Sequence, residues 1–261
     1  MMPLLLVAAV LGLVVGSFLN VVIHRVPRGE SLLRPGSRCP RCGAAIAARH
    51  NVPVLGWLLL RGRCAACGLA ISARYPLVEI GTSLLFVAVS ARFGLSLALP
   101  AYLYLAAVAV ALAAIDLDLH RLPNAIVLPS YAVGALLLLP VAAVHGDWWS
   151  AGRGLIAMAA LLAGYYAVAT LYPGGMGFGD VKLAGLLGLY LGWLGWSPVL
   201  VGAFAGFLLG GVVGALLLAT RRADRKTAIP FGPYMLAGAL LAVFVASPVA
   251  TWYGSLLTAT A

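Results

Sequence analysis

The sequence predicts an all-α polytopic membrane protein with about eight transmembrane helices and one polar loop. The chain is 63% hydrophobic, and its mean hydropathy is +1.06. Only 9% of its 261 residues are charged, whereas a soluble domain carries about 25% charged residues. Its apolar residues also form several runs of the about 20 residues that a helix needs to cross a bilayer. Lipid is therefore the expected solvent for most of the surface.

Eight apolar runs form the expected membrane-spanning part, and their Ala, Gly, Leu and Val content suits close helix packing in a bilayer. The first run is predicted to be a retained anchor rather than a cleaved signal peptide, because its basic residues, Arg25 and Arg28, follow it. Glycines and alanines from Gly202 to Gly214 are spaced for helix contact. The expected spans are residues 3–23, 76–92, 97–115, 125–144, 152–171, 181–195, 198–219 and 233–253.

The distribution of basic residues predicts the orientation. The segment 24–75 is the only long polar loop and carries nine arginines, which places it in the cytoplasm. With alternating spans, 15 of the 17 lysines and arginines then fall on the cytoplasmic side, and both termini lie outside. The net charge of +10 thus follows membrane topology, and the stretch RRADRK is expected to be a solvated loop. Nucleic-acid binding is not expected. The predicted domains are 1–23, 24–75 and a transmembrane core, 76–261.

All four cysteines lie in the long loop, as two C-x-x-C pairs separated by 21 residues. This spacing is typical of a four-cysteine zinc ribbon, and four thiolates leave no open position on the metal. The zinc is therefore expected to be structural, with His50 an ordinary loop residue. Disulfides should not persist in the cytoplasm, and a redox role or a metal-free loop is the alternative. The predicted ligands are Cys39, Cys42, Cys64 and Cys67.

Aspartates close one predicted span and open another. Asp116 and Asp118 end the third span in IDLDLHRLPN, and Asp180 begins the sixth in GGMGFGDVKL. Ionisable groups at membrane depth are costly, and they are usually paired or functional. The topology brings both segments to the cytoplasmic face, where Asp116 and Asp180 meet if the two spans pack together.

Two carboxyl groups a few ångströms apart do not both ionise, so one can act as general acid and the other as general base around one water. Glycines such as Gly177 and Gly179 would let the backbone approach a peptide substrate closely. In the alternative interpretation, Asp180 only caps the sixth helix. Lys182 either tunes Asp180 or extends its amine to the interface. His120 as a catalytic base is a weaker alternative.

Beyond these residues, the chain resembles the type IV prepilin peptidase family, whose GxGD motif is shared with presenilin-like proteases. The matching segments are GSFLNVVIHRVPRGES, CPRC, NVPVLGWLLLRGRCAACG with ISARYPLVE, IDLDLHRLPN, GMGFGDVKL and IPFGPYM. They occur in the family's order and extend over nearly the whole chain. The resemblance implies a bacterial inner-membrane aspartic endopeptidase, with Asp116 and Asp180 catalytic and 76–261 as its core. Its implied substrates are the prepilins or pseudopilins of type IV pili or type II secretion.

The resemblance also implies N-methylation of the new amino terminus with S-adenosylmethionine, an activity associated with the cysteine loop. Glu79 is a candidate for holding the substrate amine, and an ion pair with a loop arginine is the alternative. The family motif commonly ends in Leu-Pro-Asp, where this chain has Asn124. We expect Asn124 to act as a helix cap for the fourth span. A small transporter with proton-relaying aspartates, and a methyltransferase or scaffold without peptidase activity, are the competing function classes.

Overall fold

The computed structural model describes residues 1–172, 176–221 and 229–259, which are helical for most of their length. Across these ranges no β-strand occurs, and only two isolated β-bridges are found, both in the cysteine loop. Short helices in that loop are η1 (Val26–Arg28), η2 (Ala48–His50) and α2 (Leu55–Leu59). The long helices lie where the apolar runs predict them: α1 (Met2–Arg25), α3 (Arg74–Phe93), α4 (Leu99–Leu119), α5 (Asn124–His145), α6 (Trp148–Leu171), α7 (Phe178–Leu194), α8 (Trp196–Ala219) and α9 (Gly232–Ala259).

The helices have the lengths and composition of a multi-pass membrane protein. Among the described residues, six helices are long and apolar enough to cross a membrane: α1, α3, α4, α5, α6 and α8. Helix α7 has 17 residues, and it rises about 26 Å, slightly less than the about 30 Å of a hydrocarbon core. The apolar part of α9, Gly232–Ala246, is shorter. The predicted all-α fold class is confirmed.

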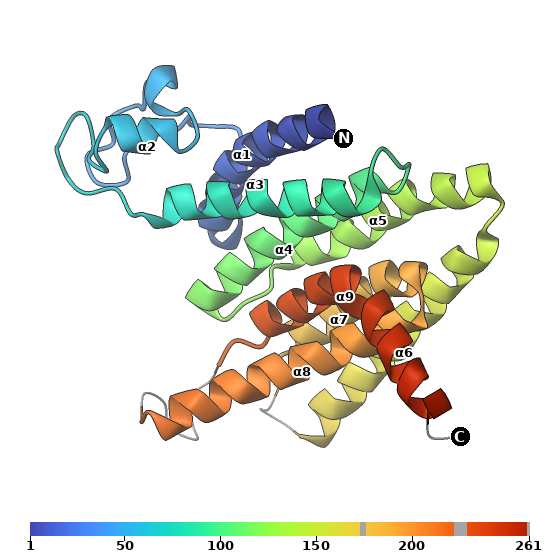
Figure 1. Ribbon diagram of the computed structural model, residues 1–261. Coiled ribbons are helices and arrows are strands. Elements are labelled where there is room, and N and C mark those ends of the chain that lie inside the picture. Colours follow the sequence, from blue (N-terminus) through green and yellow to red (C-terminus); the bar gives the residue numbers. More distant parts are fainter. Residues whose placement is uncertain (173–175, 222–228, 260–261) are drawn as a thin grey trace. The chain divides into compact units, whose positions relative to one another are not determined.

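Contacts divide the chain into two compact units, Met1–Ala111 and Leu112–Ala261. In the first unit, α1 and α3 lie side by side (Figure 1). Glycines make this approach possible, since a Cβ at Gly12 would lie 2.5 Å from the Ser83 backbone. The hydroxyl of Ser83 donates to the Ala9 carbonyl at 2.9 Å, and the Asn20 amide donates to the Tyr75 carbonyl at 3.1 Å. These bonds set the register of the pair.

In the second unit, α7 is the central helix. It packs against α5, α6, α8 and α9, and every residue from Asp180 to Gly192 except Lys182 is buried. The approach of α6 to α7 depends on glycine, because a Cβ at Gly188 would lie 2.5 Å from the Ala157 carbonyl oxygen. The four helices around α7 therefore fix the position of its first turn, which contains Asp180.

Helices α8 and α9 also pack closely (Figure 1). A Cβ at Gly238 of α9 would lie 2.5 Å from the Gly206 nitrogen of α8. A Cβ at Gly202 would meet Ala242 at 3.3 Å. The predicted role of the 202–214 glycines in helix contact is confirmed at these positions. Gly174 and Gly175 of the GGMGFGD motif, and Arg222, Asp224, Arg225 and Lys226 of the RRADRK loop, lie outside the described residues.

Candidate active site

Asp116 lies in the last turn of α4 and is 4% exposed. Its Oδ2 accepts a hydrogen bond of 3.1 Å from the backbone N–H of Gly232, the first residue of α9. A Cβ at Gly232 would lie 2.6 Å from this oxygen. Glycine is therefore required at position 232 for the backbone to reach the carboxylate. The IPFGPYM motif thus contributes a direct contact to the site.

Asp180 is the third residue of α7 and is 8% exposed. Its Oδ2 accepts the Gly177 N–H at 3.1 Å, and its own N–H donates to the Gly177 carbonyl at 3.0 Å. The helix-cap interpretation is correct for the local geometry. The capping hydrogen bond uses only Oδ2 of the Asp180 carboxylate. Asp180 can therefore cap the helix and also act as an acid or base through Oδ1. The backbone of Gly177 holds the carboxylate in place.

Leu122 lies between the first turns of α7 and α9. A Cβ at Gly179 would lie 3.1 Å from the Leu122 Cβ, and a Cβ at Gly232 would lie 3.2 Å from its Cδ2. Asp116 and Asp180, which are 64 residues apart in the sequence, are thus brought to one site, and the charge of Asp116 acts unfavourably on the carboxylate of Asp180. Both are buried, so the low dielectric of the site strengthens this repulsion. Such a pair favours one shared proton and can supply an acid and a base together.

Two other polar residues of the same segment are exposed. Asp118 is two residues beyond Asp116, and this step turns its side chain about 200° around the helix, to an exposed position. His120 is exposed and has a left-handed φ of 50°. Its N–H donates to the Asp116 carbonyl at 2.8 Å, which ends α4. Burial thus distinguishes the Asp116 side chain from those of its two exposed polar neighbours.

Lys182 contacts Asn124 and Phe178. Its Nζ lies 3.0 Å from the Asn124 Oδ1 and 4.9 Å from the centroid of the Phe178 ring. The expectation that Asn124 caps the fourth span is wrong. The N-cap of α5 is Pro123, and no side chain caps the helix, because Asn124 is already helical and its amide oxygen accepts from Lys182.

Tyr165 of α6 is a site residue that sequence reasoning missed. It is 6% exposed, and its ring lies 5.4 Å from that of Phe207 and 6.5 Å from that of Phe231, between centroids. The charge of Asp180 acts on its hydroxyl. Tyr166 beside it is 51% exposed. Nothing in the local sequence distinguishes these two tyrosines, since only the packing of α6 decides which one faces inward.

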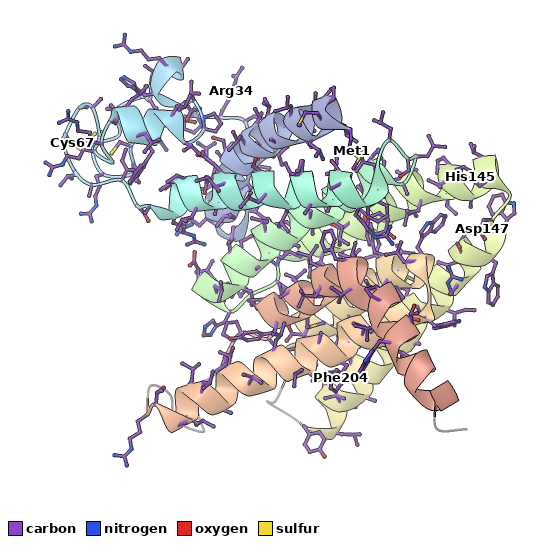
Figure 2. The ribbon with its side chains drawn as sticks, in the orientation of Figure 1. Met1, Arg34, Cys67, His145, Asp147 and Phe204 are labelled. Carbon is purple, nitrogen blue, oxygen red and sulfur yellow. The ribbon has the colours of Figure 1, made fainter. Side chains whose placement is uncertain are left out.

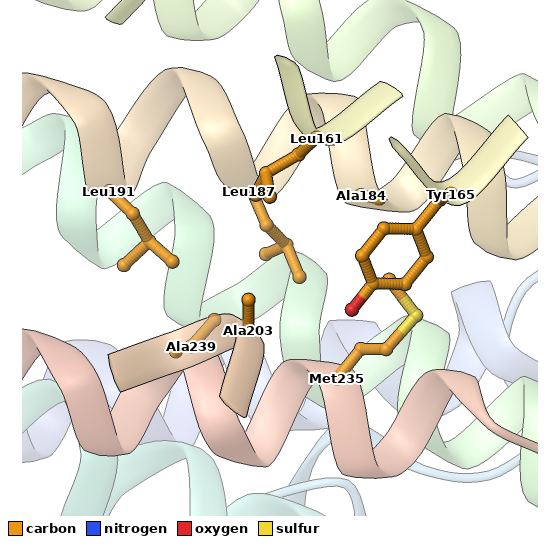
Figure 3. A pocket seen from close by; sticks show the side chains of 9 residues that line it. Leu161, Tyr165, Ala184, Leu187, Leu191, Ala203, Met235 and Ala239 are labelled. Atoms are coloured by element: carbon orange, nitrogen blue, oxygen red, sulfur yellow. The ribbon is translucent and has the colours of Figure 1, made fainter. Parts of the chain in front are cut away.

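A small cavity lies beside Tyr165, between α6, α7, α8 and α9. Figure 3 shows the Tyr165 hydroxyl directed into it, with leucine, alanine and methionine side chains around it. Ala184 and Met235 contribute to its wall. Ala184 is one helical turn beyond Asp180 on α7, and Met235 is three residues beyond Gly232 on α9. Along these two helices the cavity thus begins about one turn from Asp180 and from Gly232.

The four cysteines form a compact cluster in the loop, as predicted (Figure 2, at Cys67). Their sulfur atoms all lie within 4.8 Å of one another. The two C-x-x-C pairs have the same backbone hydrogen-bond pattern. Cys39 N–H donates to the Ala44 carbonyl at 2.9 Å, and 25 residues later Cys64 N–H donates to the Leu69 carbonyl at 2.8 Å. Each turn is closed by a glycine of positive φ (Gly43, 73°; Gly68, 69°).

Backbone N–H groups favour the thiolate form of two of these cysteines. Bonds from Cys42 and Arg41 lower the pKa of Cys39 to about 6, and bonds from Cys67 and Ala66 lower the pKa of Cys64. At Cys67 a bond from the Leu69 N–H lowers the pKa, but desolvation and the neighbouring cysteines outweigh it and raise the pKa to about 11. Four thiolates this close together repel one another, so a bound cation is needed for all four to be deprotonated at once. The donor set fits tetrahedral Zn²⁺.

Glu79 connects α3 with the cysteine loop. It is 7% exposed, and its Oε2 accepts the Val54 N–H at 2.7 Å. Val54 precedes α2 and has a φ of 59°, which is an unfavourable conformation for a β-branched residue. The partner of Glu79 is thus a backbone N–H, whereas the alternative interpretation expected a loop arginine. The carboxylate holds a strained turn against α3.

Comparisons with known proteins match both parts of the chain. Residues 10–93 match the bacterial Peptidase A24 N-terminal domain, and residues 103–219 match the type IV leader peptidase family. The first match includes the cysteine loop and Glu79. The second contains Asp116 and Asp180.

Curated relatives are similar over most of their length. The chain is 36% identical to the prepilin leader peptidase/N-methyltransferase of Stutzerimonas stutzeri, over 97% of this chain and 92% of the relative. It is 38% identical to the protein of that name in Pseudomonas putida, over 90% and 88%. For Pseudomonas aeruginosa the identity is 34%, over 93% and 91%. No solved structure matches the chain significantly.

Proposed function

The chain is an enzyme of the type IV leader peptidase family, and we propose that it is a membrane-embedded aspartic endopeptidase that removes the basic leader from type IV prepilins or pseudopilins. One observation carries this mechanism. Asp116 and Asp180, from helices far apart in the chain, are both buried and interact electrostatically. The names of the relatives support prepilins as substrates.

In the proposed reaction, one carboxylate takes a proton from a water molecule, whose oxygen attacks the scissile carbonyl carbon. The other, protonated carboxyl group donates its proton to the carbonyl oxygen, and the resulting tetrahedral intermediate then collapses. The C–N bond breaks as the first carboxyl group gives the proton it took from water to the departing amine, and the protonated oxygen of the intermediate returns its proton to the second carboxylate. The Gly232 and Gly177 N–H groups hold the two side chains in position. No nucleophilic side chain is needed.

The reaction is proposed to occur at the cytoplasmic face of the bacterial inner membrane. The positive-inside distribution of basic residues supports this orientation, as does the position of each aspartate at a helix end. Gly177 and Gly179 would border the substrate strand, and Lys182 would approach the substrate near the interface. In this proposal residues 1–23 anchor the chain, 24–75 form the zinc-binding loop, and 76–261 form the peptidase core.

The cysteine loop is proposed to bind one structural zinc ion through Cys39, Cys42, Cys64 and Cys67. When bound, the ion holds the two knuckles together. Glu79, which secures the loop to α3, is the candidate for contacting the substrate amine. The methyl donor, S-adenosylmethionine, does not fit the cavity beside Tyr165, because that cavity is lined almost entirely by apolar groups and the donor is charged. N-methylation is proposed from the relatives' names.

Substitution of each aspartate tests the peptidase mechanism. Asp116→Asn and Asp180→Asn should each abolish leader cleavage in a membrane assay, because neither amide can exchange the required proton. Asp118→Asn is the matched control, since it makes the same change two residues away at an exposed position. Its cleavage rate should be that of the unmodified protein. Normal processing by either of the first two variants would exclude that residue from the pair.

Product mass separates cleavage from methylation. Purified protein incubated with a prepilin should release the leader with or without S-adenosylmethionine. Only with the donor should the mature product gain the mass of one methyl group. A product that is methylated but never cleaved would favour the methyltransferase or scaffold alternative.

A proton-relaying transporter is the main rival from another class. Such a protein needs acidic groups near the bilayer midplane, whereas Asp116 lies in the last turn of α4 and Asp180 in the first turn of α7. Proton flux in liposomes containing the protein should therefore equal that of empty liposomes. A flux that Asp180→Asn removes would favour the transporter.

A further inference from the structure

We propose that the cysteine loop rests on the bilayer through one face of α2 and binds anionic phospholipid there. Helix α2 carries Leu55, Leu58 and Leu59, and each of these side chains is more than half exposed. Residues three and four positions apart lie on one face of a helix, so the three leucines form one apolar surface. The proposal goes beyond peptide cleavage, because it assigns a lipid-binding surface to a part of the chain that carries neither Asp116 nor Asp180.

Helix α2 faces the opposite way from a helix in a soluble domain, with its apolar side chains turned outward. Its one buried residue is Gly56, where a Cβ would overlap the His50 carbonyl oxygen. The indole N–H of Trp57 donates to the Ile71 carbonyl in the second cysteine knuckle at 3.0 Å. Glycine and tryptophan thus hold α2 against the loop. Single exposed leucines are common, but a contiguous apolar face marks a surface that contacts a partner or a membrane.

A hydrogen bond to α3 places this face at the edge of the membrane. Val54, directly before α2, donates its N–H to the Glu79 carboxylate at 2.7 Å. Glu79 is the sixth residue of α3, so it lies about 8 Å along the axis from the start of that helix. Helix α3 is long and apolar enough to cross a membrane, and its 20 residues rise about 30 Å, the thickness of the hydrocarbon core. Helix α2 therefore begins near the end of α3 that enters the membrane (Figure 1), at the depth where interfacial helices bury their apolar faces.

The charge of the loop selects the lipid. Residues 24–75 contain nine arginines and a single carboxylate, that of Glu30. Arg61 and Arg63 follow α2 and are exposed, and so is Arg49 of η2, which packs against α2. Basic residues beside a membrane are attracted to anionic lipids, and guanidinium groups pair with phosphate oxygens through two hydrogen bonds. Leucines in the apolar layer with arginines around them therefore fit an anionic phospholipid, whereas a basic peptide leader would be repelled.

Trypsin cleavage after Arg61 and Arg63 tests the proposal. The full chain is reconstituted into vesicles of phosphatidylcholine, with or without phosphatidylglycerol, and the cuts in outward-facing loops are followed by fragment mass. Phosphatidylglycerol should slow these cuts at least about fivefold, and concentrated NaCl should reverse the effect. Leu58→Ser with Leu59→Ser should lose the protection. Leu32→Ser with Leu33→Ser makes the same change at exposed leucines outside α2 and should keep it.

Equal cutting rates in the two lipids would overturn the proposal, and so would equal loss of protection in both serine variants. If the α2 variant fails to fold, as its unfolding temperature would reveal, Leu59→Trp decides the question. Its added emission, measured against the unmodified protein, should be quenched by phosphatidylglycerol with brominated acyl chains, and unquenched emission would contradict lipid contact. Protection that requires a prepilin, or that rises with the protein-to-lipid ratio, would assign the leucines to the substrate or to a second copy of the chain instead.

Discussion

The backbone N–H of Gly232 donates a hydrogen bond to the Oδ2 of Asp116 at 3.1 Å. The start of the last helix thus positions a side chain of α4, 116 residues earlier in the chain. Substitution Gly232→Ala should lower the cleavage rate about 100-fold, since its Cβ would lie 2.6 Å from this oxygen and small displacements of reacting groups have effects of about that size. The measurement is the initial rate of leader release in membranes.

The control for Gly232→Ala is Gly211→Ala, because a Cβ at Gly211 meets nothing within 4 Å. Both variants should bind the same amount of zinc. Cleavage by Gly232→Ala at the wild-type rate would show that the Asp116 position is not critical.

Loss of a cysteine ligand should release the metal. Metal analysis of the purified protein should find one zinc ion per chain, and Cys64→Ser should remove it, since four ligands complete the tetrahedral site. Chelators should have the same effect, and loss of zinc should increase proteolysis of the loop. His50→Ala is the control and should retain the metal. A freshly purified protein without zinc would contradict the prediction.

Glu79→Leu should loosen the cysteine loop from α3. It leaves the Val54 N–H without its acceptor, at a cost of about 1–3 kcal/mol. Chymotrypsin should then cut near Trp57 faster than in the unmodified protein. Glu79→Gln keeps an oxygen acceptor and should behave like the unmodified protein in this assay. Equal cutting rates for the leucine and glutamine variants would mean that this hydrogen bond does not hold the loop.

Asn124→Asp tests the departure from the family motif. It converts the Lys182–Asn124 hydrogen bond into an exposed ion pair, which should change the free energy of unfolding by about 1 kcal/mol or less. The rate of leader cleavage should remain close to that of the unmodified protein, because Asn124 touches neither carboxylate in the described contacts. A large increase in rate would indicate that an acid at this position takes part in proton transfer.

Asp147 should make stability depend on acid pH. It caps α6, which begins beside it (Figure 2), and hydrogen bonds from the Ser150 hydroxyl and N–H hold the pKa of its carboxyl below the usual range. The folded state therefore binds this proton less tightly than the unfolded state. The stabilisation is fully present at pH values above the unfolded pKa and is lost as the pH falls through the lower folded pKa. The unfolding temperature of Asp147→Asn should lack this component, so the two curves should converge in acid.

Composition, apolar runs and cysteine spacing were sufficient to predict the helices and the cysteine cluster. Apolar runs predict membrane spans because a segment in lipid must satisfy its backbone hydrogen bonds internally, as a helix does, and its own side chains must be apolar. The C-x-x-C pairs specify a cluster because each knuckle is a local turn, closed by its own glycine at Gly43 or Gly68. Local signals of this kind need no knowledge of distant contacts.

The site required the tertiary structure. Sequence placed Asp116 and Asp180 at helix ends but did not predict the Gly232 N–H contact, the Leu122 side chain between α7 and α9, or the inward orientation of Tyr165 rather than Tyr166. The prediction that Asn124 caps a helix was also wrong, because its amide oxygen accepts a hydrogen bond from Lys182 of α7. These features depend on how helices pack, and packing is decided by complementary surfaces from distant parts of the chain. Sequence thus determined the elements of this protein, and only close helix contacts decided which side chains meet.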